Sequence, residues 1–541
     1  MGDRVRDRRS WETARTIDAR ASALKPCRVP DHYSSRQTPA EEIRPWPSLW
    51  AMLIGFFMIL IDTTIVSVAN PSIQRGLGTS TTGVLWVTSS YLLAYAVPLL
   101  VTGRLGDRFG PRRVFLIGLT VFTLASLWCG LSNLLPGSGI TNLIVARAVQ
   151  GLGAAVMSPQ PMAVLTRTFP RESRGGAMAL WGATAGVGTL IGPILGGVLV
   201  DWLGWEWIFF VNVPIGLVGF LLVTRLVPHL ELHSHHFDWL GVVISGVAMF
   251  LIVFSLQEGN SYHWNAWVWS GIGAGVVVMG LFLWWQAVNR NEPLLPLNLF
   301  RDRNFSLANI AIATVGFAVT ALFVPLIYYF QLVHDMTPTQ SALMTAPSSV
   351  LGLVLAAPAG RLTDRVHPAL LAGPGILLMS GGMGLYSAMM SATTEWWWLL
   401  IPSVVMGAGS AFVWGPISTT ANRNLPLHQA GAGAGVYNAT RQLGSVIGSA
   451  AIAALMASRI GSELSAATGG ARGGSAMAGA AAELPAFLKA PFTTAMAQTL
   501  LLPAVVVLIG AICAFAFGKP AFMGSGADGE SASQTSRTAS H

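Results

Sequence analysis

The stretch that decides the fold runs from Ser48 to Ala69 and reads SLWAMLIGFFMILIDTTIVSVA. Its length matches the about 20 apolar residues that a helix needs to cross a hydrocarbon core of about 30 Å. One acid, Asp62, interrupts this stretch. A carboxylate inside a membrane helix costs roughly 2.5 to 3.5 kcal/mol on insertion scales, so Asp62 indicates a function.

The rest of the chain has the same character. It has 541 residues, of which 52% are hydrophobic and only 10% charged, and its mean hydropathy is +0.57. Because the bilayer interior offers no water to an open backbone, spanning segments of this length must be helices. We therefore expect an all-α polytopic membrane protein with fourteen spans. The spans lie near residues 48–69, 84–103, 114–134, 142–166, 175–200, 206–226, 239–257, 266–287, 305–332, 339–360, 369–390, 396–419, 431–457 and 495–517.

The distribution of basic residues predicts the orientation. With both termini in the cytoplasm, cytoplasmic segments hold 26 of the 32 Lys and Arg residues and outer loops hold four. This is the asymmetry of the positive-inside rule. The net charge of +8 then reflects topology and attraction to anionic lipid headgroups, and it indicates no nucleic-acid partner.

An internal repeat predicts the domain organisation. GRLGDR at Gly103–Arg108 recurs as GRLTDR at Gly360–Arg365, and two further groups of matches, among them Pro159 with Pro416, follow at nearly the same offset. Spans one to six are thus related to spans nine to fourteen, in a 6+2+6 arrangement. Two such parallel halves are typical of secondary transporters. The predicted parts are a disordered tail 1–46, a half 47–228, an insertion 229–290, a half 291–518 and a disordered tail 519–541.

Four motifs carry a resemblance to a known family. They are the loop GRLGDRFGPRR at 103–113, RAVQGLG at 147–153, GTLIGPILGG at 188–197 and the segment from Asp62 to Pro71. With them the chain resembles the major facilitator superfamily, and within it the fourteen-span drug:proton antiporters, over residues 47–518. The resemblance implies the major facilitator fold and multidrug efflux driven by the proton gradient, without a bound cofactor.

The loop after the second span is a candidate cytoplasmic gate. Its glycines, at 103, 106 and 110, are expected to let the backbone turn tightly. A cluster of opposite charges can lock helix ends together in one state and release them in another. The alternative is that the basic residues only keep this loop on the cytoplasmic side and thereby set the topology. The gating residues are Gly103, Asp107, Arg108, Gly110, Arg112 and Arg113.

The fifth span is rich in small residues that allow helices to approach closely, and it contains a proline that bends a helix. Such a helix is a packing seam in many membrane proteins. The resemblance identifies this one as the antiporter motif, with Gly188, Gly192, Pro193, Gly196 and Gly197.

Arg147 is the second charge within a span. At 1.5 Å per residue it lies roughly 8 Å from the outer side and Asp62 roughly 12 Å, so the two side chains could meet. Burial favours the protonated acid and a guanidinium favours the ionised one, and their balance can place titration in the working pH range. We expect Asp62, Arg147 and Gln150 to couple transport to protons. A permanently ionised structural pair is the alternative.

Arg441 lies within the thirteenth span, next to Tyr437, Asn438 and Gln442. Tyr437, Asn438 and Arg441 are a possible lining of the central substrate cavity, although a packing role for Arg441 is equally compatible with the sequence. The histidines at 229, 233, 235 and 236 are expected in a solvated inner loop, without a metal. No nucleotide-binding motif or zinc-site spacing occurs.

These features predict a plasma-membrane exporter of amphipathic small molecules that exchanges them for protons by alternating access. Cationic compounds are expected, because they could compete with the proton for Asp62. A dedicated exporter of one metabolite is an alternative, and a receptor without flux is a weaker one. The spans contain no recognisable catalytic set of a nucleophile and a base, so an enzyme is not expected. The predicted partners are the substrate, protons and membrane lipid, with no obligate protein partner.

Overall fold

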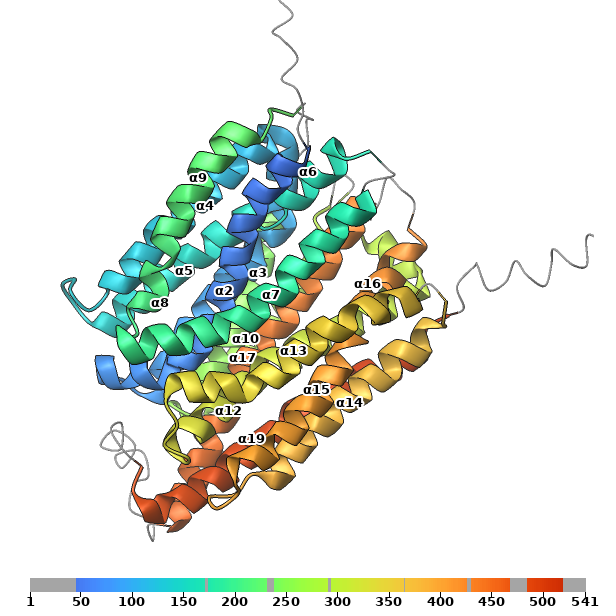
Figure 1. The fold of residues 1–541 in the computed structure, drawn as a ribbon. Coiled ribbons are helices and arrows are strands. Elements are labelled where there is room, and N and C mark those ends of the chain that lie inside the picture. Colours follow the sequence, from blue (N-terminus) through green and yellow to red (C-terminus); the bar gives the residue numbers. More distant parts are fainter. Residues whose placement is uncertain are drawn as a thin grey trace, which may run out of the picture. The chain divides into compact units, whose positions relative to one another are not determined.

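The computed structural model describes residues 45–170, 174–230, 238–289, 293–363, 365–425, 430–467 and 484–518. Regular secondary structure in these ranges is helical, without a strand (Figure 1). Thirteen helical stretches in these ranges are long and apolar enough to cross a membrane, three of them made of consecutive shorter helices. The predicted all-α, multi-pass membrane class is therefore confirmed. Apart from Pro45 and Trp46, the predicted tails lie outside the described residues.

We call the helices before residue 230 the first group and those after residue 296 the second group. The first group is α2 (Pro45–Leu77), α3 (Thr81–Phe109), α4 (Pro111–Leu131), α5 (Gly139–Met157), α6 (Gln160–Thr168), α7 (Arg174–Trp202), α8 (Trp207–Phe210) and α9 (Asn212–Leu226). The second is η1 (Leu297–Arg301), α12 (Arg303–Leu332), α13 (Pro338–Thr363), α14 (Pro368–Met389), η2 (Trp396–Leu399), α15 (Leu400–Ala411), α16 (Trp414–Arg423), α17 (Ala430–Ala467) and α19 (Ala486–Phe515). Between them lie α10 (Trp239–Glu258) and α11 (Ala266–Val288).

The helix of the fifth predicted span, α7, is the one missing from the thirteen. Among the residues whose side chains are described, its apolar stretch is Gly186–Trp202, whereas the whole helix has 29 residues. The fourteenth span therefore stays a prediction.

Two predicted spans are each divided into two helices at the repeated prolines. The fourth is divided between α5 and α6, where Pro159 precedes the first residue of α6. The twelfth is divided between α15 and α16, and Pro416 lies in the first turn of α16. Proline has no backbone N–H and fits only the first turn of a helix without breaking it. The repeat found in the sequence thus corresponds to a repeated break in the structure.

Each group has its own apolar core. The largest cluster of buried side chains comes almost entirely from the second group, with Phe330, Tyr386 and Phe492 among its large members. The first group holds further clusters, one of them around Phe115 and Phe122. Across the seam between the groups, α3 packs against α17, α7 against α13 and α2 against α12.

The hairpin of α10 and α11 touches both groups, because α10 packs against α3 and against α17. Trp86 Nε1 donates to Glu258 Oε1 at 2.6 Å, and Asn260 Nδ2 donates to the carbonyl of Ala454 at 2.5 Å. At its other end, Asp238 accepts from Trp285 Nε1 at 2.8 Å and from Gln286 Nε2 at 2.7 Å. Glu258 and Asn260 therefore fix the inserted hairpin to both groups, whereas Asp238 holds its two helices together.

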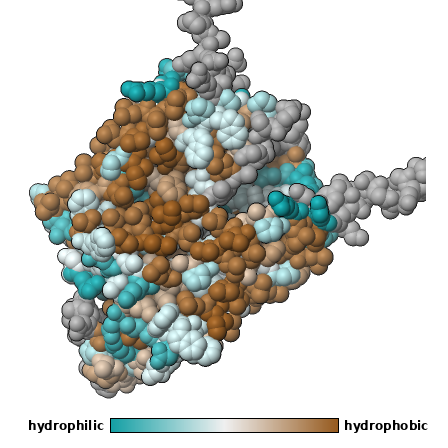
Figure 2. All heavy atoms as spheres, in the orientation of Figure 1, coloured by the Kyte–Doolittle hydropathy of each residue, from teal (hydrophilic) through white to brown (hydrophobic). Residues whose placement is uncertain are grey.

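The surface is strongly apolar. Large hydrophobic side chains are more than half exposed on helices of both groups and of the hairpin, including Ile117, Val277, Leu370 and Ile512. The face seen in Figure 2 is covered largely by hydrophobic residues. A soluble protein rarely exposes such an area, whereas a bilayer covers it.

Candidate functional site

Asp62 lies in the interior of the first group and has no exposed surface. Its Oδ2 atom accepts a hydrogen bond from Arg147 Nη1 at 2.6 Å. Its Oδ1 atom accepts from Gln150 Nε2 at 2.9 Å and from Asn212 Nδ2 at 3.1 Å. The structure therefore brings together the three residues that the sequence selected, and it adds a fourth.

Arg147 is held on several sides. It is 1% exposed. Besides Asp62, its Nη1 atom donates to Gln150 Oε1 at 2.7 Å, and its Nε atom donates to the carbonyl of Val87 at 3.3 Å. The guanidinium also lies over the ring of Tyr91, 4.1 Å from its centroid. A planar, permanently charged guanidinium suits such a site, because it bonds at its edge and stacks on its face.

Ser126 and Asn212 were not selected from the sequence. Ser126 Oγ accepts from Asn212 Nδ2 at 3.0 Å and from Gln150 Nε2 at 3.2 Å, and it donates to the carbonyl of Phe209. Asn212 follows an apolar run, so the cost of burying an amide could have identified it. Serine is common in membrane helices, and no signal marks Ser126.

These five side chains, which we call the acid network, come from α2, α4, α5 and α9. All of them belong to the first group, so the second group contributes nothing to it among the described contacts. Three hydrogen-bond donors thus converge on one buried carboxylate. A proton can reach Asp62 only if this arrangement opens.

The glycines of the predicted antiporter motif place α7 between the two groups. A Cβ atom at Gly192 would overlap Thr64 Oγ1 on α2, two residues from Asp62, and one at Gly197 would overlap the backbone of Thr339 on α13. Gly188 and Gly196 also face α2, and Pro193 lies inside the helix. These close approaches need residues without a side chain.

The predicted gating loop differs from expectation. α3 continues to Phe109, so Gly103 and Gly106 lie within a helix, and only Gly110 turns, with φ of 90°. The expectation of tight turns at Gly103 and Gly106 was wrong, because the helix ends in a single glycine followed by proline at the first position of α4. At Gly106 the glycine instead allows close approach of Gln160.

The charges of this loop are not clustered around one partner in the described residues. Arg112 donates to the carbonyl of Thr224 and lies 3.0 Å from His229 Nδ1. Arg113 is exposed, and Arg108 lies over the ring of Phe109. The side chain of Asp107 lies outside the described residues, and so do the histidines at 233, 235 and 236. The ionic lock therefore stays a prediction.

In the second group, the predicted cavity residues lie on one stretch of α17. Tyr437 is 6% exposed, and Arg441 is half-buried. Asn438 Nδ2 donates to the carbonyl of Ala434 on its own helix at 3.0 Å. The asparagine is thus engaged locally, whereas the side chain of Arg441 stays partly exposed.

Polar contacts join the groups where α2 ends. Tyr328 Oη donates to Gln74 Oε1 at 2.7 Å, and Gln331 Nε2 donates to the carbonyl of Val68 at 3.0 Å. The backbone N–H of Thr339 donates to Asp201 Oδ2 at 3.0 Å. In the predicted topology this is the outer side, so the contacts would close the molecule outward in this state.

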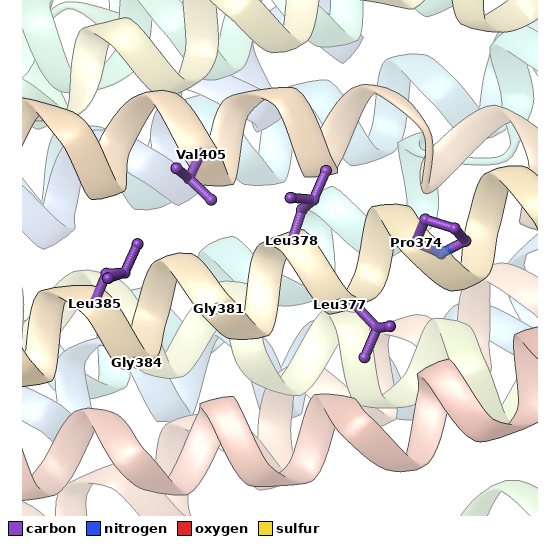
Figure 3. Close-up of a pocket in the computed structure, with 7 residues that line it drawn as sticks. All are labelled: Pro374, Leu377, Leu378, Gly381, Gly384, Leu385 and Val405. Carbon is purple, nitrogen blue, oxygen red and sulfur yellow. The ribbon is translucent and has the colours of Figure 1, made fainter.

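An apolar groove of about 660 Å³ lies elsewhere, on α14 and α15 (Figure 3). Its lining is Pro374, Leu377, Leu378, Gly381, Gly384, Leu385 and Val405. No polar side chain lines it, and its leucines belong to the exposed apolar surface. The groove is therefore distinct from the acid network and from the candidate cavity residues.

A helical membrane protein of two helix groups, with an enclosed acid in one of them, has the architecture of a secondary transporter. The chain belongs to the Major Facilitator Superfamily, whose family model matches residues 52–449. Family and fold are those of transporters, which act on small molecules.

Several relatives are named as transporters or resistance proteins. An uncharacterized MFS-type transporter of Mycobacterium tuberculosis (strain H37Rv) is 50% identical, over 87% of this chain and 80% of its own length. The tetracenomycin C resistance and export protein of Streptomyces glaucescens is 33% identical, over 77% of each chain. The multidrug resistance protein Stp of Mycobacterium tuberculosis (strain CDC 1551) is 35% identical, over 75% of this chain and 74% of its own. The predicted relationship to drug-efflux transporters is confirmed.

Among solved structures, a bacterial homolog of the human lysosomal transporter Spinster matches with a TM-score of 0.58. The match covers 87% of this chain and 96% of that one, at 16% identity. At this identity the likeness shows the fold.

Proposed function

We propose that this protein is a proton-coupled exporter of amphipathic small molecules that works by alternating access in the plasma membrane. Its fourteen spans would form two six-helix halves, 47–228 and 291–518, around the inserted pair 229–290, with both termini in the cytoplasm. The proton gradient would supply the energy, without a bound cofactor or an obligate protein partner.

The observation that carries this proposal is the enclosed carboxylate of Asp62. A buried ion pair is weak evidence for stability, because removing two charges from water costs nearly as much as their attraction returns. Its presence in a membrane helix therefore favours a functional role. The one acid of the network can gain and lose a proton, whereas the guanidinium of Arg147 stays charged.

Protonation would change the packing of the network. A neutral Asp62 no longer balances the charge of Arg147, so Arg147 and Gln150 would re-form their bonds with new partners. Thr64 follows Asp62 on α2 and contacts Gly192 of α7, and Gly197 of α7 contacts Thr339 of α13. A shift of α2 would thereby reach the second group through α7, which supports a role for the glycine motif in antiport.

Alternating access also needs contacts that break. The bonds of Gln74 with Tyr328 and of Asp201 with Thr339 are candidates on the outer side. On the cytoplasmic side, we propose that Asp107 and the arginines of the loop form the corresponding lock in the other state.

The names of the relatives support export, and they leave open whether one compound or many are exported. One relative is named for resistance to many drugs and another for a single compound. A dedicated exporter of one metabolite therefore remains the second candidate, with the same coupling chemistry.

Flux in proteoliposomes under imposed pH and voltage gradients tests the proposal. Wild-type protein should accumulate an amphipathic dye against its gradient when protons flow the other way. Asp62→Asn should abolish the response to the pH gradient and leave at most downhill movement. Uphill transport with an unchanged proton dependence in Asp62→Asn would contradict the proposal.

A further inference from the structure

Arg441 is a charge within an apolar helix, and the described residues give its side chain no partner. It lies 11 residues after the first residue of α17, roughly 16 Å along the helix. Its guanidinium forms no ion pair and no hydrogen bond in the described part of the chain. The buried arginine of the first group, Arg147, makes three hydrogen bonds and stacks on two rings. A packing role for Arg441 would require bonds to neighbouring carbonyls, and its side chain makes none to the residues that the structure describes.

Its position on the helix directs Arg441 to the protein interior. Residues three, four and seven positions later share its face. Of these, Gly444 and Gly448 lie so close to α12 that a Cβ atom would overlap the carbonyls of Ala313 and Phe317, and Ser445 Oγ donates to the carbonyl of Gly316. Arg441 therefore faces the inside of the second group, one turn before this contact. Because it is half-buried and unpaired, it needs water or a ligand beside it.

A second polar group lies beside it. Long side chains in a helix point back toward its N-terminus, which brings Arg441 toward Tyr437. The hydroxyl of Tyr437 is buried, lies within the field of the Arg441 charge and has no hydrogen-bond partner of normal geometry, although Ser418 is its neighbour. A buried hydroxyl without a partner costs free energy, so Tyr437 would gain a hydrogen bond if a ligand entered beside Arg441.

Both groups offer hydrogen-bond donors, and the guanidinium offers only donors. We propose that Arg441 and Tyr437 bind an anionic oxygen group of the transported molecule, such as a carboxylate or an ionised enol. Arginine binds such a group with two parallel hydrogen bonds. This inference rests on the proposed export function and names the substrate class: amphipathic molecules that carry a negative charge.

The acid network supports this choice over the cationic substrates expected from the sequence. Asp62 has no exposed surface, and its oxygens already accept three hydrogen bonds. A cationic substrate could not reach it in this state. Arg441, in contrast, is partly exposed and would repel a cation.

Three fluorescent probes with one chromophore test the inference. Dansylglycine carries a carboxylate, dansylglycinamide is its neutral counterpart, and dansylcadaverine is a cation. We expect the wild-type protein in lipid nanodiscs at pH 7 to bind dansylglycine more tightly than the other two. Arg441→Gln should weaken dansylglycine binding roughly tenfold to hundredfold, the effect of losing one hydrogen bond to a charged group, and leave dansylglycinamide unchanged.

Three further variants test whether the effect is specific to this site. Arg441→Lys retains the charge and should keep part of the preference, and Tyr437→Phe should lose a smaller part. Arg459→Gln removes an exposed arginine from the same helix and should change nothing. The inference is overturned if wild-type protein binds dansylglycine no better than dansylglycinamide, or if the preference survives in Arg441→Gln. Because binding is measured without a proton gradient, failure of proton-coupled flux would count against the proposed function alone.

Discussion

Asn212 Nδ2 lies 3.1 Å from Asp62 Oδ1 and donates to the same oxygen atom as Gln150. The amide of Asn212 is thus one of three donors that hold the ionised carboxylate. Asn212→Ala removes this donor and leaves the carboxylate of Asp62 with two of its three hydrogen bonds. We expect the pH profile of transport in proteoliposomes to change, because Asp62 is the proposed proton-binding group. Asn142→Ala, a control on α5 away from the network, should leave the pH profile unchanged.

Removing one member of the buried ion pair should destabilise the fold. Asp62→Asn leaves the charge of Arg147 without a counterion, which typically costs about 3–5 kcal/mol. Arg147→Met in the same protein should recover most of this loss, because the apolar side chain needs no counterion. Thermal unfolding in detergent measures both. Equal stability of the single and double variants would show that Arg147 finds another partner, while neither variant should regain proton-coupled transport.

The close packing of α7 predicts a steric effect. Gly192→Val puts a branched side chain where Thr64 of α2 already lies, and overpacking of this kind costs about 1–3 kcal/mol. We expect a lower thermal midpoint and slower transport. Gly384→Val is the matched control on α14, because a Cβ atom at Gly384 meets nothing within 4 Å. Similar losses in both variants would argue against a specific α2–α7 contact.

His334 predicts a pH dependence of stability. It lies between α12 and α13, and burial together with the nearby Lys489 lowers its pKa, against the opposing charges of Asp335 and Glu395. The unfolded chain therefore binds the proton more readily than the folded protein. The contribution of His334 to the free energy of unfolding is fully present above the unfolded pKa of about 6.5. It falls as the pH drops below that value. The thermal midpoint of His334→Gln should fall less between pH 7.5 and pH 5 than that of the wild type.

The charge of the substrate sets the response to voltage. One charge moved through 100 mV supports roughly a 50-fold gradient, and two charges support roughly a 2,000-fold gradient. Export of a monoanion in exchange for one proton moves two positive charges inward, whereas a neutral substrate moves one. Accumulation of dansylglycine in proteoliposomes should therefore respond more steeply to an imposed potential than that of dansylglycinamide. If the accumulation of both probes depended equally on the potential, exchange of one proton for an anion would be contradicted.

Much of the architecture could be predicted from residue types alone. Apolar stretches of the right length gave the helices, because a bilayer leaves the backbone no other way to bond. The cost of a buried charge was enough to select Asp62 and Arg147, and their similar depth was enough to suggest contact. Asn212 and Ser126 were missed, because a small polar side chain is tolerated in a membrane helix and only its neighbours show whether it is used.

Other features depend on contacts that no local pattern contains. Gly103 and Gly106 have the composition of a turn, but the helix continues through them because Gly110 and Pro111 end it one turn later. The sequence alone left a packing role and a cavity role for Arg441 equally open. The close approach of α12 to the same face of α17, and the absence of a partner among the described residues, support the cavity role that we propose.

Asp62 and its donors belong to the first group, whereas Arg441 and Tyr437 belong to the second. Energy conversion and molecular selectivity would thus depend on separate stretches of the gene. A mutation near Arg441 could extend the range of exported compounds without disturbing the residues that would couple export to the proton gradient. Such separation lets a lineage that meets new toxic chemicals adapt by single substitutions, each of which leaves the ability to use the gradient intact.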